Sequence, residues 1–183
     1  DAMFVSVKDR DKAFKMQPYE EELLKDESHF RVLNLSTNTF NEARTSYYFK
    51  SIGGYSAAKL RRYQDLIDVH IAPEMNPLMQ TIVQTNGFML PCNGDSIFPV
   101  LNMLNMKYVI VPLQNGSQMP VQNPYAMGNC WFVDSLMVVD NANDEIAALS
   151  QIDLHTTAVV DKSFAEVLRT PSNFHLKGET GRV

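Results

Sequence analysis

The sequence has few cysteines and no long apolar run. Its two cysteines, Cys92 and Cys130, have neither a CxxC spacing nor the density of a disulfide scaffold. We interpret them as two small, partly buried side chains, with a single bridge as the alternative. The longest apolar stretches, residues 108–113 and 131–139, are far shorter than the ~20 residues that a membrane-spanning helix needs. The piece is therefore expected to be soluble, with any signal or membrane anchor outside it.

The chain also lacks a basic excess and the short motifs of several enzyme classes. Its net charge of −5 argues against a general nucleic-acid binder, because such a protein needs cations to displace counterions from phosphates. No GxSxG, GxxxxGK[ST] or GxGxxG pattern is present, so neither a hydrolase elbow nor a nucleotide-binding loop is predicted. The sequence therefore predicts no complete catalytic site and disfavours a free-standing hydrolase.

Neither a metal site nor a cofactor is predicted. The four histidines are scattered, and none has a Cys, Asp or Glu at a known zinc-ligand spacing. They are His29, His70, His155 and His175. Residues 140–145 resemble a calcium loop, but the sixth position is Glu145 instead of glycine and the twelfth is Gln151. A helix cap at Asn141 or Asn143 is the better interpretation.

Short apolar strands and helices alternate along the chain. The expected strands are residues 30–35, 107–111, 131–139 and 157–161, and the expected helices are residues 18–26, 56–72, 76–85, 97–104 and 142–150. Residues 40–49 are expected to form a loop with aromatic anchors, and residues 114–129 an irregular connection. This order predicts a single α/β domain, in which helices cover a small mixed sheet, over residues 1–169. Residues 170–183 are expected to be a linker toward a further C-terminal portion.

One amphipathic helix is predicted most clearly. Its expected apolar face consists of Leu60, Tyr63, Ile67 and Ile71, which recur three or four residues apart. Ser56 is the expected N-cap and Pro73 the expected end.

The stretch that leads into this helix is the candidate binding site. It consists of Lys50, Gly53, Gly54, Tyr55, Lys59, Arg61 and Arg62. A glycine turn allows close backbone approach, and a helix start with nearby cations is a reasonable anion site. At most two of the three helical cations can join such a site, because a helix turns successive residues to different faces. The alternative is a glycine turn followed by a solvated helix face, with Arg61 or Arg62 paired to Asp65 or Asp68.

Several pieces of the chain, in the same order, resemble a known family. The most specific is KSIGGYSAAKLRRYQDLID at residues 50–68. The others are FRVLNL at 30–35, LNMLNMKYVI at 101–110, NPYAMGNCWFV at 123–133 and TAVVD at 157–161. Together they resemble a segment of the large bacterial membrane proteins of the YfhO family, especially those of Bacteroides-like bacteria, over approximately residues 3–165.

Members of that family look like multi-spanning glycosyltransferases of the GT-C class, which use lipid-phosphate-linked sugars outside the cytoplasmic membrane. The resemblance implies that this chain is an extracytoplasmic domain beside the membrane helices of its parent protein. Its expected role is accessory: to help position a glycan acceptor or the phosphate of a lipid-linked donor. The alternative is a structural or partner-binding envelope module without substrate contact. The resemblance places the catalytic acids outside this chain. Several relatives resemble this chain but carry His at the position of Ser56, which argues against an essential role of this side chain.

Overall fold

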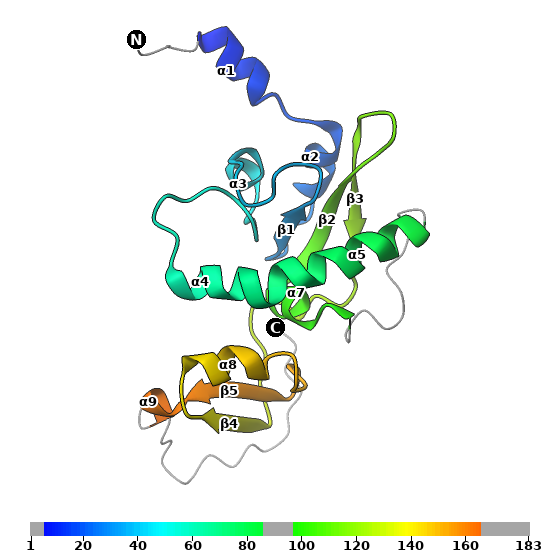
Figure 1. Cartoon of the computed structure of the whole chain (residues 1–183). Helices are drawn as coiled ribbons and strands as arrows, with labels where there is room; N and C mark the ends of the chain where they lie inside the picture. The colour runs from blue at the N-terminus through cyan, green and yellow to red at the C-terminus, as the bar shows by residue number, and fades with distance from the viewer. Residues whose placement is uncertain (1–5, 86–96, 166–183) are drawn as a thin grey trace. The chain divides into compact units, whose positions relative to one another are not determined.

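The structure is a computed structural model that describes residues 6–85 and 97–165 (Figure 1). The predicted α/β class with a small mixed sheet is confirmed. The sequence predicts one domain over residues 1–169, and within that range the contacts form two compact units, Asp1–Trp131 (unit 1) and Phe132–Val183 (unit 2). The predicted boundary at residue 169 lies outside the described residues.

A three-stranded mixed sheet forms the centre of unit 1. It consists of β1 (Arg31–Asn34), β2 (Met106–Pro112) and β3 (Gln118–Gln122), in that order. Strand β1 is parallel to β2, and β3 is antiparallel to β2. The prediction of an irregular connection is wrong at β3, whose short sequence QMPVQ is interrupted by a proline. Pro120 is accepted there because β3 is an edge strand, where a missing N–H can face outward.

Four short helices flank this sheet in the chain. They are α1 (Val7–Ala13), α2 (Pro18–Leu23), α3 (Arg44–Tyr48) and α7 (Pro99–Met103). The predicted start of a helix at Pro18 is confirmed, with a capping box between Gln17 and Glu20. Helix α3 lies where the sequence predicts a loop, and it delivers one of the expected aromatic anchors, Phe49, into the interior.

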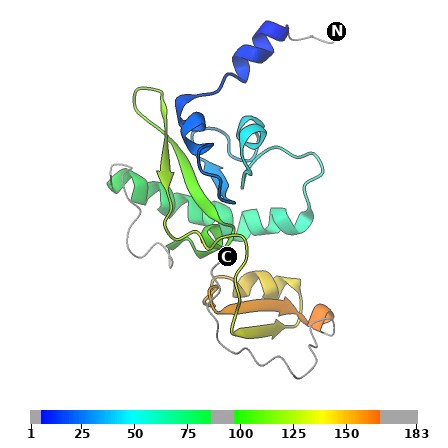
Figure 2. The ribbon, with the colours of Figure 1, turned by 180° about the vertical axis from the view of Figure 1, so that it is seen from behind.

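A long helical rod crosses one face of the sheet (Figures 1 and 2). It consists of α4 (Arg61–Leu66), the π-helical turn η1 (Ile67–Ile71) and α5 (Ala72–Gln84), which follow one another without a break. The predictions that Ser56 caps this helix and that Pro73 ends it are wrong. Helix α4 begins at Arg61, and Pro73 lies in the first turn of α5. In an α-helix a proline ring clashes with the carbonyl group four residues earlier. The π turn directly before Pro73 changes the position of that carbonyl group relative to the ring, so the helix can continue.

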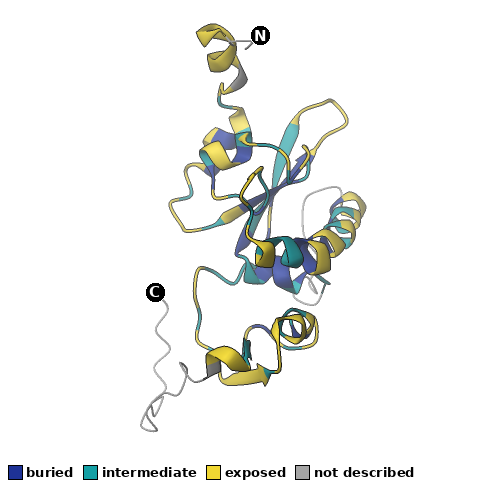
Figure 3. Cartoon of the chain, turned by 60° about the vertical axis from the view of Figure 1, so that its left-hand side comes forward, coloured by how far each residue is buried: buried dark blue, intermediate teal, exposed yellow. Residues whose placement is uncertain are grey.

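The rod contributes most of its predicted apolar face to the core. Ile67 and Ile71 are buried, and half-buried Tyr63 donates its hydroxyl to the Ile52 carbonyl at 2.5 Å. Leu60 was expected on the same face but is 76% exposed, because it precedes the helix at the N-cap. The buried side chains of β1, β2 and α7 complete this core, which is dark blue in Figure 3.

Unit 2 is a small β-α-β arrangement. Strands β4 (Ser135–Val139) and β5 (Thr157–Asp161) are parallel neighbours, joined through α8 (Ala142–Ala148), and α9 (Lys162–Ala165) follows. The predicted bounds of β5 are confirmed, whereas β4 begins four residues later than expected. Asn141 caps α8 through its side-chain oxygen, which confirms the cap interpretation of residues 140–145. No described helix of the chain is long and apolar enough to cross a membrane.

Candidate functional site

The structure separates the seven predicted site residues. Lys50 lies at an open pocket, and the glycine pair folds instead against the loop around Thr39. The backbone N–H of Gly53 donates to Ser51 Oγ at 3.1 Å, that of Gly54 to the Thr39 carbonyl at 2.7 Å, and that of Tyr55 to the Glu42 carbonyl at 2.9 Å. These three N–H groups are therefore already hydrogen-bonded within the protein. A ligand could accept from them only by displacing those partners.

Close packing explains why glycines stand in this turn. A Cβ atom added to Gly53 would lie 2.0 Å from the Thr39 carbonyl oxygen, and Gly54 has a φ of +100°. Neither position suits an ordinary side chain.

The cations that follow the glycines point to several partners. Lys59 Nζ lies 5.4 Å from the ring centroid of Phe40, and Arg61 Nε pairs with Asp65 Oδ1 at 2.9 Å on the exposed surface. Arg62 and Tyr55 are exposed. The Arg61–Asp65 pair is the one that the alternative interpretation expects for a solvated helix face. A contribution of Tyr55, Lys59 and Arg62 to binding stays a prediction.

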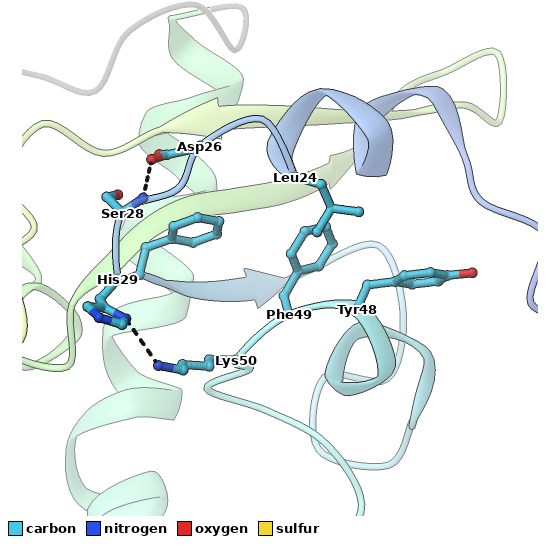
Figure 4. A pocket seen from close by; sticks show the side chains of 8 residues that line it. Leu24, Asp26, Ser28, His29, Tyr48, Phe49 and Lys50 are labelled. Atoms are coloured by element: carbon cyan, nitrogen blue, oxygen red, sulfur yellow. Dashed lines mark hydrogen bonds between the residues drawn. The ribbon is translucent and has the colours of Figure 1, made fainter.

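Lys50 lines a pocket of about 160 Å³ where three segments meet. The lining residues come from the end of α2, the segment before β1 and the end of α3. They are Leu24, Asp26, Ser28, His29, Phe30, Tyr48, Phe49 and Lys50. Figure 4 shows the Lys50 and His29 side chains pointing toward each other, with Asp26 and Ser28 farther along the same wall.

The apolar part of the pocket consists of aromatic rings set on the core. The Phe30 centroid lies 6.4 Å from that of Phe49 and 5.0 Å from that of Tyr108, the latter pair edge-to-face. Phe49 belongs to a buried cluster with Val32 and Ile110, so the core fixes the rings in place. Fixed aromatic faces suit the C–H faces of a sugar ring or another flat, partly apolar group.

The cationic rim of the pocket is formed by Lys50 and His29. Lys50 Nζ lies 3.4 Å from His29 Nδ1, and both residues are exposed. An ammonium only donates, so the ring nitrogen accepts in this contact. Lys50 has further N–H donors beyond this one, and its positive charge at the edge of an aromatic pocket can meet a negatively charged oxygen.

Asp26 is held by its neighbours and is a poor candidate for a base. It accepts hydrogen bonds from Lys107 Nζ at 2.5 Å, from the Tyr108 hydroxyl at 2.8 Å and from the Ser28 N–H at 3.0 Å. The Lys107 ammonium first, and then Ser28, hold the pKa of this carboxyl well below its usual range. Burial, together with Asp26, raises the pKa of Tyr108 to about 12. This cluster ties the segment before β1 to β2.

A second ion pair joins α2 to α3, the two helices whose C-terminal ends reach the pocket. Buried Glu20 of α2 accepts from Arg44 of α3 through both of its oxygens, at 3.0 Å from Nε and 2.7 Å from Nη2. The Tyr48 hydroxyl also donates to the Phe14 carbonyl. The Glu20–Arg44 pair thereby holds α2 to α3, and the Tyr48 hydrogen bond holds α3 to the end of α1.

Glu74 is a further buried acid whose pKa is shifted. Its two carboxylate oxygens accept from the backbone N–H groups of Val100 at 3.0 Å and Leu101 at 2.9 Å, at the start of α7. Burial raises its pKa to about 7, against the two hydrogen bonds, which lower it. Glu74 therefore joins the helical rod to α7, and its role is structural.

Sequence reasoning missed most of this pocket. His29 was treated as one of four scattered histidines, and Asp26 and Lys107 are 81 residues apart in the chain. No local pattern reports such a contact, which depends on the parallel pairing of β1 with β2. Among the described residues, no group of three or more His, Cys, Asp or Glu is placed to hold a metal ion. Cys130 is a free, exposed thiol, and Cys92 lies outside the described residues.

No protein-family model, curated protein or solved structure matches this chain in the three comparisons made with known proteins. The resemblance to the YfhO family therefore stays a prediction.

Proposed function

We propose that this chain is an accessory binding domain of a multi-spanning, glycosyltransferase-like membrane protein. Its role is to help position a glycan acceptor or the phosphate of a lipid-linked sugar at the outer face of the cytoplasmic membrane. The resemblance in sequence supplies the membrane context, and the pocket at Lys50 supplies the binding chemistry. The fragment alone carries out no reaction in this proposal.

The observation that carries the proposal is the pairing of an aromatic wall with a lysine at its rim. Phe30 and Phe49 offer fixed ring faces, and Lys50 lies at the rim of the same pocket. A sugar phosphate has the matching halves, because its ring has apolar C–H faces and its phosphate carries negative charge. The pocket volume of about 160 Å³ suits one small group and not an extended oligosaccharide.

The test is binding of glucose 1-phosphate to the chain, followed by amide and methyl NMR. Glucose and inorganic phosphate are titrated separately, since each carries one half of the recognised chemistry. We expect saturable shifts at Phe30, Phe49 and Lys50 with glucose 1-phosphate, and weaker binding of either half. Lys50→Ala should weaken binding about tenfold, the size of one lost charge-assisted contact.

Two control variants make the result specific. Lys8→Ala removes an exposed lysine of α1 and should leave the affinity unchanged. Lys59→Ala tests the basic residues that follow the glycine turn. A loss of affinity in this variant would show that the ligand binds at the glycine turn and not in the pocket. Absence of saturable shifts, or equal affinities of Lys50→Ala and the parent chain, would refute the pocket as the site.

The alternative, a partner-binding module, has one observation in its favour. Strand β4 of unit 2 exposes three consecutive apolar side chains, Leu136, Met137 and Val138.

A further inference from the structure

The outer edge of β4 has the features of an open strand-binding site. Among the described residues, β4 pairs with β5 and with no other strand. The Ser135 N–H donates to the Thr156 carbonyl at 3.1 Å. Since successive residues of a strand in a parallel pair direct their N–H groups to opposite sides, those of Leu136 and Val138 face the outer edge.

The side chains of β4 are uncovered on both faces. Leu136 is 52% exposed, Met137 41% and Val138 54%. Neighbouring side chains of a strand point to opposite faces of the sheet. Exposure at three successive positions therefore means that α8 and α9 do not cover the sheet fully at β4. Parallel sheets are normally buried on both faces, which makes a two-stranded parallel sheet with this exposure unusual.

The edge also lacks the features that usually protect such strands. Exposed edge strands commonly carry lysine, proline or a bulge that prevents pairing with another chain. Strand β4 has none of these between Ser135 and Val139, and its register with β5 is regular. Phe132, three residues before β4, is 89% exposed and extends the apolar surface.

The charge of unit 2 indicates which kind of segment fits. Between residues 132 and 165 the sequence has six carboxylates and one basic side chain, Lys162. Asp134 and Asp140 stand directly at the two ends of β4, and Asp140 pairs with Lys162 at 3.0 Å. Antiparallel pairing of β4 with a second copy would bring together two acidic units, each with five more carboxylates than lysines in residues 132–165, and such like-charged surfaces repel each other. A segment with basic residues on either side of an apolar centre has the opposite charge to this surface.

We infer that β4 adds an extended apolar peptide segment, flanked by lysine or arginine, as a further strand of the unit 2 sheet. The backbone of the segment pairs with the outward N–H and C=O groups of Leu136 and Val138. Its apolar side chains cover those of β4, and its basic flanks meet the acidic surface of unit 2, which includes Asp134 at the start of β4. Strand addition of this kind obtains affinity from the main chain and selectivity from alternate side chains.

The probe is a soluble peptide with a Val-Thr-Val-Thr-Val centre and two lysines at each end. It is titrated into the full chain and followed by amide NMR and hydrogen exchange. In the free protein we expect the amides of Leu136 and Val138 to exchange quickly and that of Met137 slowly. With the peptide bound, all three should exchange slowly, with saturable shifts over residues 134–140.

Two altered peptides separate the contributions. N-methylation of alternate residues of the centre, on the side that faces β4, keeps the side chains but removes the main-chain donors, and should abolish binding. Replacing the four lysines by glutamates keeps the strand but reverses the charge, and should weaken binding at least about tenfold at low salt.

Protein variants supply the matched control. Val138→Lys places a charge on the exposed strand and should weaken binding about tenfold or more. Ala147→Lys places the same charge on the exposed side of α8 and should leave binding unchanged. Equal affinities of these two variants would overturn the inference, as would binding of the N-methylated peptide.

Two further outcomes would assign the edge to another occupant and also overturn the inference. Slow exchange of all β4 amides in the free protein would mean that another segment of the chain already covers the edge. A dimer in sedimentation experiments that Val138→Lys dissociates would assign the edge to a second copy. Neither outcome depends on the pocket at Lys50, so a failure here is distinguishable from a failure of the proposed function.

Discussion

Replacing Glu74 by glutamine should remove a large part of the pH dependence of the stability of unit 1. Glu74 is 9% exposed, and burial raises its pKa from 4.5 to about 7. The folded state therefore retains a proton that the unfolded state has already released between these two values. Stability is greatest below the unfolded pKa and falls as the pH rises through the folded pKa.

The size of this effect follows from the shift. A difference of about 2.5 pKa units corresponds to about 3 kcal/mol of unfolding free energy, lost between roughly pH 4.5 and pH 7.5. Glutamine is neutral at every pH, but it has one acceptor oxygen where Glu74 uses two, so one of the N–H groups of Val100 and Leu101 loses its partner. This loss costs about 1–3 kcal/mol at every pH. The stability of the variant relative to the parent chain should therefore start below zero at pH 5 and rise by about 3 kcal/mol toward pH 8.

Urea unfolding of both chains at pH 5, 6, 7 and 8 measures this difference. All seven tyrosines and the single tryptophan lie within residues 1–131, so near-ultraviolet circular dichroism reports on unit 1. Subtracting the two stability curves removes the contribution of the histidines, which titrate in the same range. A difference that stays constant across the series would refute a raised pKa at Glu74. A parent chain that gains stability relative to the variant toward pH 8 would show that the two hydrogen bonds outweigh burial.

Two further predictions concern backbone packing and the helical rod. Gly53→Ala should destabilise unit 1 by about 3 kcal/mol or more, because the new Cβ would lie 2.0 Å from the Thr39 carbonyl oxygen. Gly116→Ala is the control, because no atom lies within 4 Å of the added Cβ and only the φ of +79° opposes the change. We expect this variant to lose about 1–2 kcal/mol. Equal losses of stability in the two variants would contradict the close contact at Gly53. Ile67→Ala should cost about 2–5 kcal/mol, whereas Leu60→Ala, at a 76% exposed position, should change stability by less than about 0.5 kcal/mol. A large loss at Leu60 in urea unfolding would show that the helix begins earlier than Arg61.

Elements with a local signal could be predicted from the sequence. Strand β5 is a short β-branched run between polar residues, and α8 begins after an asparagine whose side chain binds the first N–H groups. The start of α2 follows from Pro18 and the acidic residues after it. In each case the residues that determine the element lie within the element or next to it.

Elements that depend on distant partners could not be predicted. Strand β3 pairs residue by residue with β2 although it has only two apolar residues and a central proline, so the pairing and not the propensity determines it. Pro73 normally indicates a helix end, but the π turn before it lets the rod continue into α5. Ser56 has the right chemistry for a cap, yet the chain from Tyr55 to Lys59 does not enter the helix.

The candidate site shows the same division. The sequence analysis predicts Lys50 as a site residue beside a glycine turn, and it groups Lys50 with residues that follow it closely in the chain. The structure places Lys50 beside His29, 21 residues earlier, and directs the glycine N–H groups into the fold. Residues that are close in sequence have predictable relative positions only within a helix or strand. The segment from Lys50 to Leu60 contains no helix or strand.

The net charge of the chain is distributed unevenly between its two units. The sequence has a total charge of −5, and residues 132–165 alone carry six carboxylates against one lysine. Residues 1–131 hold 13 acidic and 12 basic side chains, so unit 1 is nearly neutral. The net charge of the whole chain therefore comes mainly from unit 2, and it does not indicate the charge near the pocket at Lys50. Charge acts over about 10 Å at moderate salt, and an anion at this pocket responds to nearby groups such as Lys50 and Asp26. Of these two, Asp26 is already paired with Lys107, so Lys50 determines the sign of the charge that the pocket offers to a ligand.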